Sequence, residues 1–107
     1  MTDAAANNML VEDIKGSLRG VIDPELGHNV VDLGLIYEVT VESGAAAHVV
    51  MTTTTRGCPA TAFLKQGVYE SASSVAGVAS VDVTLTYDPP WTPQMMSDDT
   101  KQFLGIR

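Results

Sequence analysis

The sequence is poor in the residue types that most often mark redox chemistry or nucleic-acid binding. Its 107 residues include one cysteine and one tryptophan, and 6 lysines and arginines stand against 13 aspartates and glutamates. One cysteine cannot form an internal disulfide, which fits a reducing compartment. A formal charge of −7 leaves no basic patch, and nucleic acids and anionic membranes both select cationic surfaces. We therefore expect protein or metal partners, and no binding to nucleic acid or membranes.

Long apolar runs and common cofactor motifs are also missing. No run approaches the ~20 residues of a membrane span, and the N-terminal MTDAAANN lacks the basic-then-apolar pattern of a secretion signal. These features predict a cytoplasmic protein. No CxxC, HExxH, GxGxxG or P-loop motif occurs. The length predicts one domain over residues 1–107, of which residues 1–8 are expected to be flexible.

Hydrophobic periodicity predicts three helices and three strands. In chain order they are a helix over 8–20, strands over 35–42 and 47–55, a helix over 59–76, a strand over 78–87 and a short helix between Ser97 and Gly105. Asn7 or Asn8 is expected to cap the first helix, and Gly20 to end it. Gly77 is expected to end the second helix in the left-handed conformation. The buried face of that second helix is predicted to comprise Ala60, Phe63, Leu64, Val68, Ser71, Ala72 and Val75.

This α-β-β-α-β-α order predicts an α/β (α+β) fold in one compact domain. A turn at residues 43–45 should join the first two strands into a hairpin. The following strand-helix-strand unit should form a parallel crossover, giving a small mixed three-stranded sheet with helices packed on it. Residues 24–34 are expected to form an ordered loop held by short apolar anchors.

The single cysteine lies where a strand is predicted to give way to a helix, in the stretch TTTTRGCPAT. Pro59 suits the first position of a helix, which would make Cys58 the N-cap residue. The helix N-terminus would then stabilise a thiolate and lower the pKa of Cys58 below about 8.5, with Arg56 adding to the effect. A small buried hydrophobic residue is the alternative interpretation of Cys58.

Other candidate ligands are few. The loop after the first helix holds Asp23, Glu25, His28 and Asp32. Each of these side chains alone is more typical of a turn or a solvent-exposed surface. His48 is expected at the surface of the second strand. A nucleophile and base can be constructed from Cys58 and His28, but only their residue types favour that pair.

Five segments, in order along the chain, resemble one family. They are DPEL (23–26), NVVDLGLIY (29–37), MTTTTRGCP (51–59), VDVTLTYDPPW (81–91) and the tail from residue 91 to 105. The chain resembles the metal-sulfur cluster assembly family that includes the SufT-like factors and the longer PaaD-like proteins. The resemblance extends from about residue 9 to residue 106 and implies a compact α/β domain with its functional site at the cysteine.

The resemblance also implies which residues form the site. They are Asp23, Glu25, Leu26, Thr54 and Cys58, with residues 89–91 nearby as a wall. Family members help mature iron–sulfur proteins or deliver clusters to them, without turnover of a small substrate. At His28 the family usually has an apolar residue, so this histidine is either incidental or an extra ligand. PaaD-like members carry additional C-terminal cysteines, and their absence here argues against a PaaD role.

Ligand count limits what one cysteine can do. Iron–sulfur clusters are typically held by four ligands, mostly thiolates, so Cys58 implies a transient or shared iron or iron–sulfur contact and no tightly bound cofactor. The leading hypothesis is a non-enzymatic factor that delivers clusters through Cys58. Its partners would be the iron–sulfur assembly machinery and client apoproteins, and a homodimer is left open. The alternatives are a PaaD-like accessory protein of a multicomponent oxygenase, a thiol enzyme with Cys58 as nucleophile, and an adaptor in which Cys58 is structural.

Overall fold

The computed structural model describes residues 4–54, 57 and 59–105. Its elements are α1 (Ala4–Leu18), β1 (Ile36–Glu42), β2 (Ala46–Met51), α2 (Thr61–Ser73), β3 (Ser80–Leu85), the short 3₁₀ helix η1 (Pro93–Met95) and α3 (Asp98–Leu104). The predicted α-β-β-α-β-α order is confirmed, with η1 added before the last helix.

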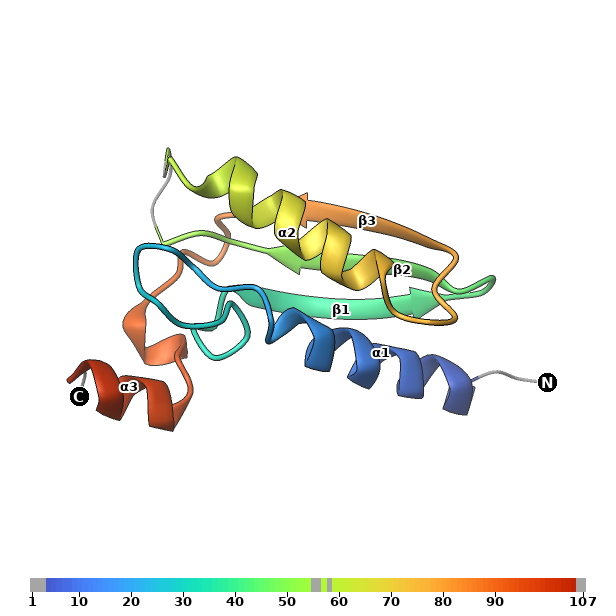
Figure 1. Ribbon diagram of the computed structural model, residues 1–107, viewed down its shortest axis with the longest axis horizontal. Helices are drawn as coiled ribbons and strands as arrows, with labels where there is room; N and C mark the ends of the chain where they lie inside the picture. Colours follow the sequence, from blue (N-terminus) through green and yellow to red (C-terminus); the bar gives the residue numbers. More distant parts are fainter. Residues whose placement is uncertain (1–3, 55–56, 58, 106–107) are drawn as a thin grey trace.

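The three strands form one mixed sheet in the order β1-β2-β3. β1 and β2 are antiparallel and are joined by a tight turn, in which Gly44 and Ala45 have φ angles of 80° and 59°. β2 and β3 are parallel, in a continuous register from Ala46 opposite Ser80 to Met51 opposite Leu85. The predicted hairpin and parallel crossover are therefore confirmed. Figure 1 shows α1 and α2 together on one face of this sheet.

The core lies between these two helices and the sheet. Its buried residues are Ile14, Leu18, Val21, Val30, Leu33, Leu35, Val39, Ala47, Val49, Met51, Ala60, Leu64, Val68, Ala72 and Met96. Ser17 and Ser71 join α1 to α2, because each hydroxyl donates to the other residue's carbonyl oxygen, at 3.0 and 2.9 Å. Val30, Leu33 and Leu35 are fully buried, which confirms that the loop before β1 is anchored by apolar side chains.

The first helix differs from the prediction at both ends. It begins at Ala4, within the segment expected to be flexible, so Asn7 and Asn8 lie inside the helix and do not cap it. Three successive alanines at 4–6 explain the earlier start, because alanine has the highest helix propensity. The helix ends at Leu18 and not at Gly20, whose N–H donates to Ser17 O at 3.0 Å in a tighter closing turn.

The second and third strands are shorter than predicted. β2 ends at Met51 and not at residue 55, and β3 spans 80–85 and not 78–87. A strand extends only as far as its neighbours pair with it. Since β1 begins at Ile36 and β3 ends at Leu85, the threonines that follow Met51 lie beyond the regular ladder.

The second helix also starts later and ends earlier than its sequence pattern predicts. It spans 61–73, with Ala60 at the N-cap position, and the left-handed Gly77 (φ 95°) lies beyond its end. Its buried residues are Leu64, Val68 and Ala72. Phe63 is 63% exposed, so its assignment to the buried face was wrong. Successive helical residues are about 100° apart around the axis. Because Leu64 faces the core, the preceding residue Phe63 points away from it.

The C-terminal segment is fastened to the loop before β1. Trp91 donates its indole N–H to Leu33 O at 2.8 Å, and the backbone N–H of Ser97 donates to Asp32 O at 2.7 Å. The predicted cap of the last helix is confirmed, because Ser97 Oγ accepts the N–H of Thr100 at 3.3 Å. These bonds hold η1 and α3 at the end of the sheet where the loop lies (Figure 1).

We expect Gly34→Ala to destabilise the protein much more than Gly27→Ala. Both glycines have positive φ angles, 77° and 72°, and forcing alanine into that conformation costs about 1–2 kcal/mol. Only at Gly34 would the new Cβ also meet backbone, 2.7 Å from the carbonyl carbon of Met95. Urea unfolding followed by circular dichroism should show a loss of at least about 3 kcal/mol for Gly34→Ala. Equal losses for the two variants would contradict the tight contact with Met95.

Candidate functional site

Three segments meet at the carboxyl ends of the parallel strands β2 and β3. The segment after β2 is bonded to the loop before β1 through Thr52 N–H and Leu35 O, at 2.8 Å. It is bonded to the segment after β3 through the hydroxyls of Thr53 and Tyr87, at 2.9 Å. Figure 1 shows all three segments at the same end of the sheet. This is the edge at which open α/β sheets bind ligands.

Asp23 organises the loop that reaches this end of the sheet. It is only 2% exposed. Its carboxylate oxygen Oδ1 accepts the backbone N–H of Glu25 at 2.7 Å and that of Leu26 at 3.2 Å. Its own N–H donates to His28 O at 2.9 Å, and its carbonyl oxygen accepts the N–H of Gly27 at 2.8 Å. The buried carboxylate therefore fixes the backbone of the DPEL segment.

Glu25 and Leu26 differ in exposure on that fixed loop. Glu25 is exposed, whereas Leu26 is half-buried and packs against the core. The leucine anchors the loop while the glutamate side chain is accessible to solvent. An exposed carboxylate on a rigid loop can act as an oxygen ligand or contact a partner.

The threonines after β2 differ in exposure along the segment. Thr52 and Thr53 are buried, and Thr54 is half-buried. The bond between Thr53 and Tyr87 was not predicted, since the two residues are 34 positions apart. The one signal in the sequence is that both residues follow strands that pair with each other, so the two segments lie side by side.

The prediction that Cys58 caps the second helix is wrong. The N-cap position belongs to Ala60, which has no side-chain acceptor, and the helix begins at Thr61. Pro59 lies in the turn before it and not at the first helical position. The lowered pKa that was predicted from capping therefore loses its physical premise. Cys58 itself, like Arg56, lies outside the described residues.

The two histidines have other neighbours. The ring of His28 packs edge-on against Phe103 of α3, with ring centroids 4.9 Å apart. His48 lies in β2, within 3.4 Å of the Asp82 carboxylate and 3.1 Å of the Thr84 hydroxyl. Within 4–54, 57 and 59–105, no three histidine, cysteine, aspartate or glutamate side chains gather as a metal site would require. An extra ligand at His28 therefore stays a prediction.

The segment expected as a wall lies beside the loop. Pro89 O accepts the hydroxyl of Tyr37 at 2.8 Å, and the indole of Trp91 is bonded to Leu33. These contacts hold residues 89–91 against the start of β1.

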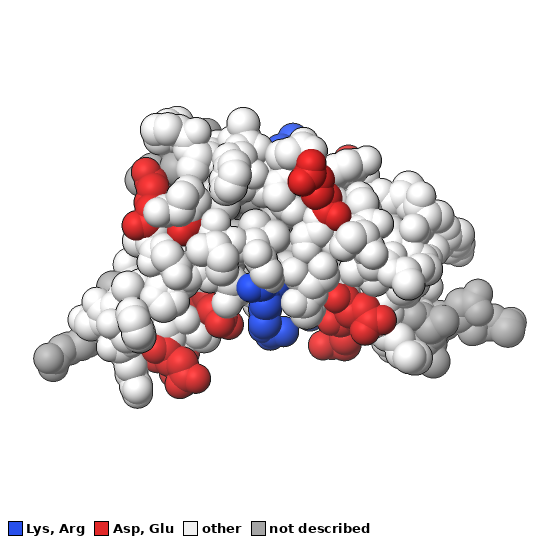
Figure 2. Space-filling model, in the orientation of Figure 1, with Lys and Arg blue, Asp and Glu red and all other residues white. Residues whose placement is uncertain are grey.

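Figure 2 shows one face of the molecule, on which acidic side chains are dispersed and basic ones are few. No helix of the described chain is both long and apolar enough to cross a membrane.

The chain is therefore a small α/β domain with a mixed sheet, in which loops gather at the carboxyl ends of the parallel strands. Residues 11–85 match the family described as iron-sulfur cluster assembly protein. The chain belongs to this family, which confirms the resemblance drawn from its motifs.

Several relatives cover nearly the whole chain. The Fe-S protein maturation auxiliary factor YitW of Bacillus subtilis is 38% identical, over 92% of this chain and 96% of the relative. The Fe-S protein maturation auxiliary factor SufT of Staphylococcus aureus is 38% identical, over 80% of this chain and 98% of the relative. A putative 1,2-phenylacetyl-CoA epoxidase component of Escherichia coli is 35% identical, over 88% of this chain and 56% of the relative.

Solved structures share the fold. A domain of unknown function from Bacillus anthracis has a TM-score of 0.90 and 35% identity, over 97% of this chain and 99% of that domain. A conserved hypothetical protein from Thermotoga maritima has a TM-score of 0.78 and 40% identity, over 89% of this chain and 93% of that protein. The compact mixed sheet with three helices is therefore the fold of these relatives as well.

We expect Asp23→Ala to destabilise the protein and Glu25→Ala to leave its stability nearly unchanged. Removing the buried carboxylate leaves the two N–H groups of the DPEL segment without their acceptor, at a cost of about 1–3 kcal/mol. Glu25 is exposed, and surface changes usually alter the free energy of unfolding by no more than about 0.5 kcal/mol. Urea denaturation of both variants is the measurement. Asp23→Asn, which keeps a carbonyl acceptor, should recover most of the loss, and failure to do so would disprove the bonding role.

Proposed function

We propose that this protein is a non-enzymatic factor in the maturation of iron–sulfur proteins, acting in the cytoplasm through a transient iron or iron–sulfur contact at Cys58. The single observation that carries the proposal is the similarity to maturation auxiliary factors over 92% of this chain and 96% of the relative. Its partners are iron–sulfur assembly proteins and client apoproteins. The iron or cluster is the cargo and not a resident cofactor.

The ligand count supports delivery over storage. A cluster needs about four ligands, and the chain has one cysteine. Such a site holds its cargo only with ligands from another chain or from small molecules. An incompletely ligated cluster is easily released, which suits a factor that passes cargo to a client.

The neighbouring residues have distinct roles in this proposal. Asp23 fixes the loop backbone, and Leu26 anchors that loop to the core. Glu25 offers an exposed carboxylate to iron or to the client. Thr54, half-buried after β2, leads the chain into the segment with Cys58. The cysteine thus belongs to a segment whose start is held against the loop before β1 by the bond between Thr52 and Leu35.

In a strain that lacks this protein, we expect Cys58→Ser to fail to restore the activity of iron–sulfur enzymes. Glu25→Ala should restore it only partly, because the exposed carboxylate is lost while the loop stays intact. Glu42→Ala is the matched control, since Glu42 is exposed at the far end of β1. Circular dichroism and immunoblotting should show all three variants folded and equally abundant. Full restoration by Cys58→Ser would make the cysteine dispensable and refute the proposed contact.

We expect the cluster-loaded protein to contain more than one chain. With one thiolate per chain and about four ligands per cluster, anaerobic reconstitution with iron and sulfide should produce colour and an increase in mass together. Size exclusion with iron and sulfide analysis measures both, and Cys58→Ser should abolish both. A coloured, strictly monomeric species formed without added thiol would refute a site shared between chains.

A further inference from the structure

The outer edge of β3 is open to another strand. β3 is the last strand of the sheet, and β2 is its only neighbour in the described residues. The N–H of Thr86 donates toward β2, to Met51 O at 2.9 Å. Because backbone groups alternate in direction along a strand, the N–H and C=O groups of Val81, Val83 and Leu85 face the outer edge. An edge with unpaired backbone groups is a template for strand pairing.

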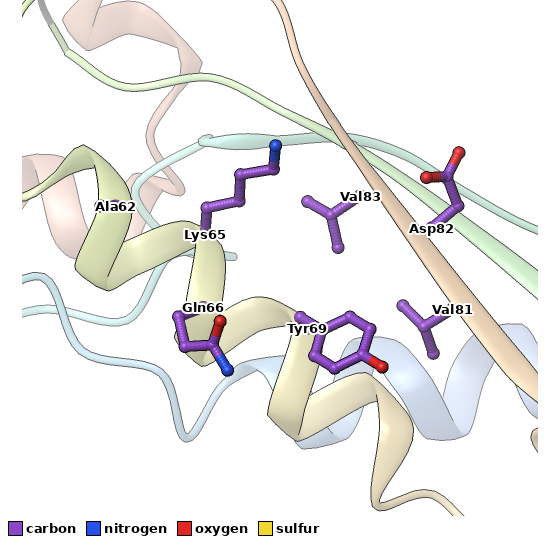
Figure 3. Close-up of a pocket in the computed structure, with 7 residues that line it drawn as sticks. All are labelled: Ala62, Lys65, Gln66, Tyr69, Val81, Asp82 and Val83. Atoms are coloured by element: carbon purple, nitrogen blue, oxygen red, sulfur yellow. The ribbon is translucent and has the colours of Figure 1, made fainter.

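A pocket of about 540 Å³ lies beside this edge, between α2 and β3. It is lined by Ala62, Lys65, Gln66, Tyr69, Val81, Asp82 and Val83. In Figure 3, Lys65 and Tyr69 extend from α2 toward Val83 and Val81, and Asp82 points to the opposite side of the strand. Tyr69 is 45% exposed. The pocket therefore offers apolar surface to every second side chain of a strand added at the edge.

Charges of opposite sign flank the two sides of the edge. On the pocket side, no carboxylate of the described chain lies within 4 Å of the Lys65 ammonium. On the other side, the Asp82 side chain is 75% exposed, and His48 Nδ1 lies 3.4 Å from its carboxylate. Side chains of an added strand alternate between its two faces. Those on the pocket side would lie near the Lys65 ammonium, and those on the other side would lie near the Asp82 carboxylate.

We propose that the edge of β3 binds an extended segment of a partner protein as a fourth strand. Apolar and acidic side chains of that segment face the pocket and Lys65, and basic side chains face Asp82. In such strand addition, main-chain hydrogen bonds supply affinity and the pockets for alternate side chains supply specificity. The inference rests on the edge and its pocket, and it is independent of the function proposed for Cys58.

Charge favours a partner segment over a second copy of this chain. A two-fold dimer joins identical patches, so a β3-to-β3 pairing would bring two chains of charge −7 together. Among the described residues that line the pocket, Asp82 alone carries a carboxylate, and it points to the other face of the strand (Figure 3). On the pocket side, Lys65 would therefore meet no carboxylate of that lining in a second copy. A segment with a glutamate at that position satisfies Lys65, and a lysine in it satisfies Asp82.

The test is a titration of the isotope-labelled full chain with a synthetic peptide, followed by NMR. The probe is a blocked peptide of about eight residues, with valine and glutamate on one side and lysine and threonine on the other. We expect shifts and slowed exchange at the amides of Val81, Val83 and Leu85. Tyr69→Ala and Lys65→Glu should each weaken binding by at least about tenfold. Phe63→Ala is the matched control, because Phe63 is exposed on the same helix but lines a different groove, with Ile22.

A second probe removes only the backbone hydrogen bonds. The same peptide, N-methylated at the amides that would pair with β3, should not bind although its side chains are unchanged. Undiminished binding of this peptide, shifts centred on Ile22 and Phe63, or no shift at about 1 mM peptide would each overturn the proposal. So would self-association of the unliganded chain that protects the same β3 amides, since a second copy would then occupy the edge.

Discussion

The burial of the loop between α1 and β1 is the constraint on which the rest of this end of the molecule depends. Val30, Leu33 and Leu35 are fully buried, and they fix a segment that has no regular secondary structure. The backbone of this segment then serves as a template, because Leu33 O and Leu35 O accept hydrogen bonds from Trp91 and Thr52. Loosening these anchors would free the segments after both β2 and β3.

The same loop carries one buried and one exposed carboxylate. Asp23 is buried, and its carboxylate accepts hydrogen bonds from two backbone N–H groups of the loop. The neighbouring acid Glu25 is exposed. Two carboxylates two positions apart thus differ in exposure. A buried carboxylate that already accepts hydrogen bonds within its loop is poorly suited to bind a metal, whereas an exposed one is accessible.

The two proposals concern different segments of the chain. The proposed cargo contact is Cys58, which follows β2 in the sequence and lies outside the described residues. The partner edge runs along the side of β3, where backbone groups and the pocket with Tyr69 are available.

The sequence alone determined the order of the elements, the hairpin, the parallel crossover and the cap at Ser97, because each depends on periodicity or chemistry within a few residues. The site residues, drawn from a resemblance and not from geometry, stay a prediction. Tertiary structure decided what depends on distant neighbours. β2 ends at Met51 because its partners end there, and Phe63 is exposed because the core takes the row of Leu64 and Val68. Local rules at Pro59 allowed a helix start or a turn, and only the packing of the whole chain selected the turn and placed Ala60 at the N-cap.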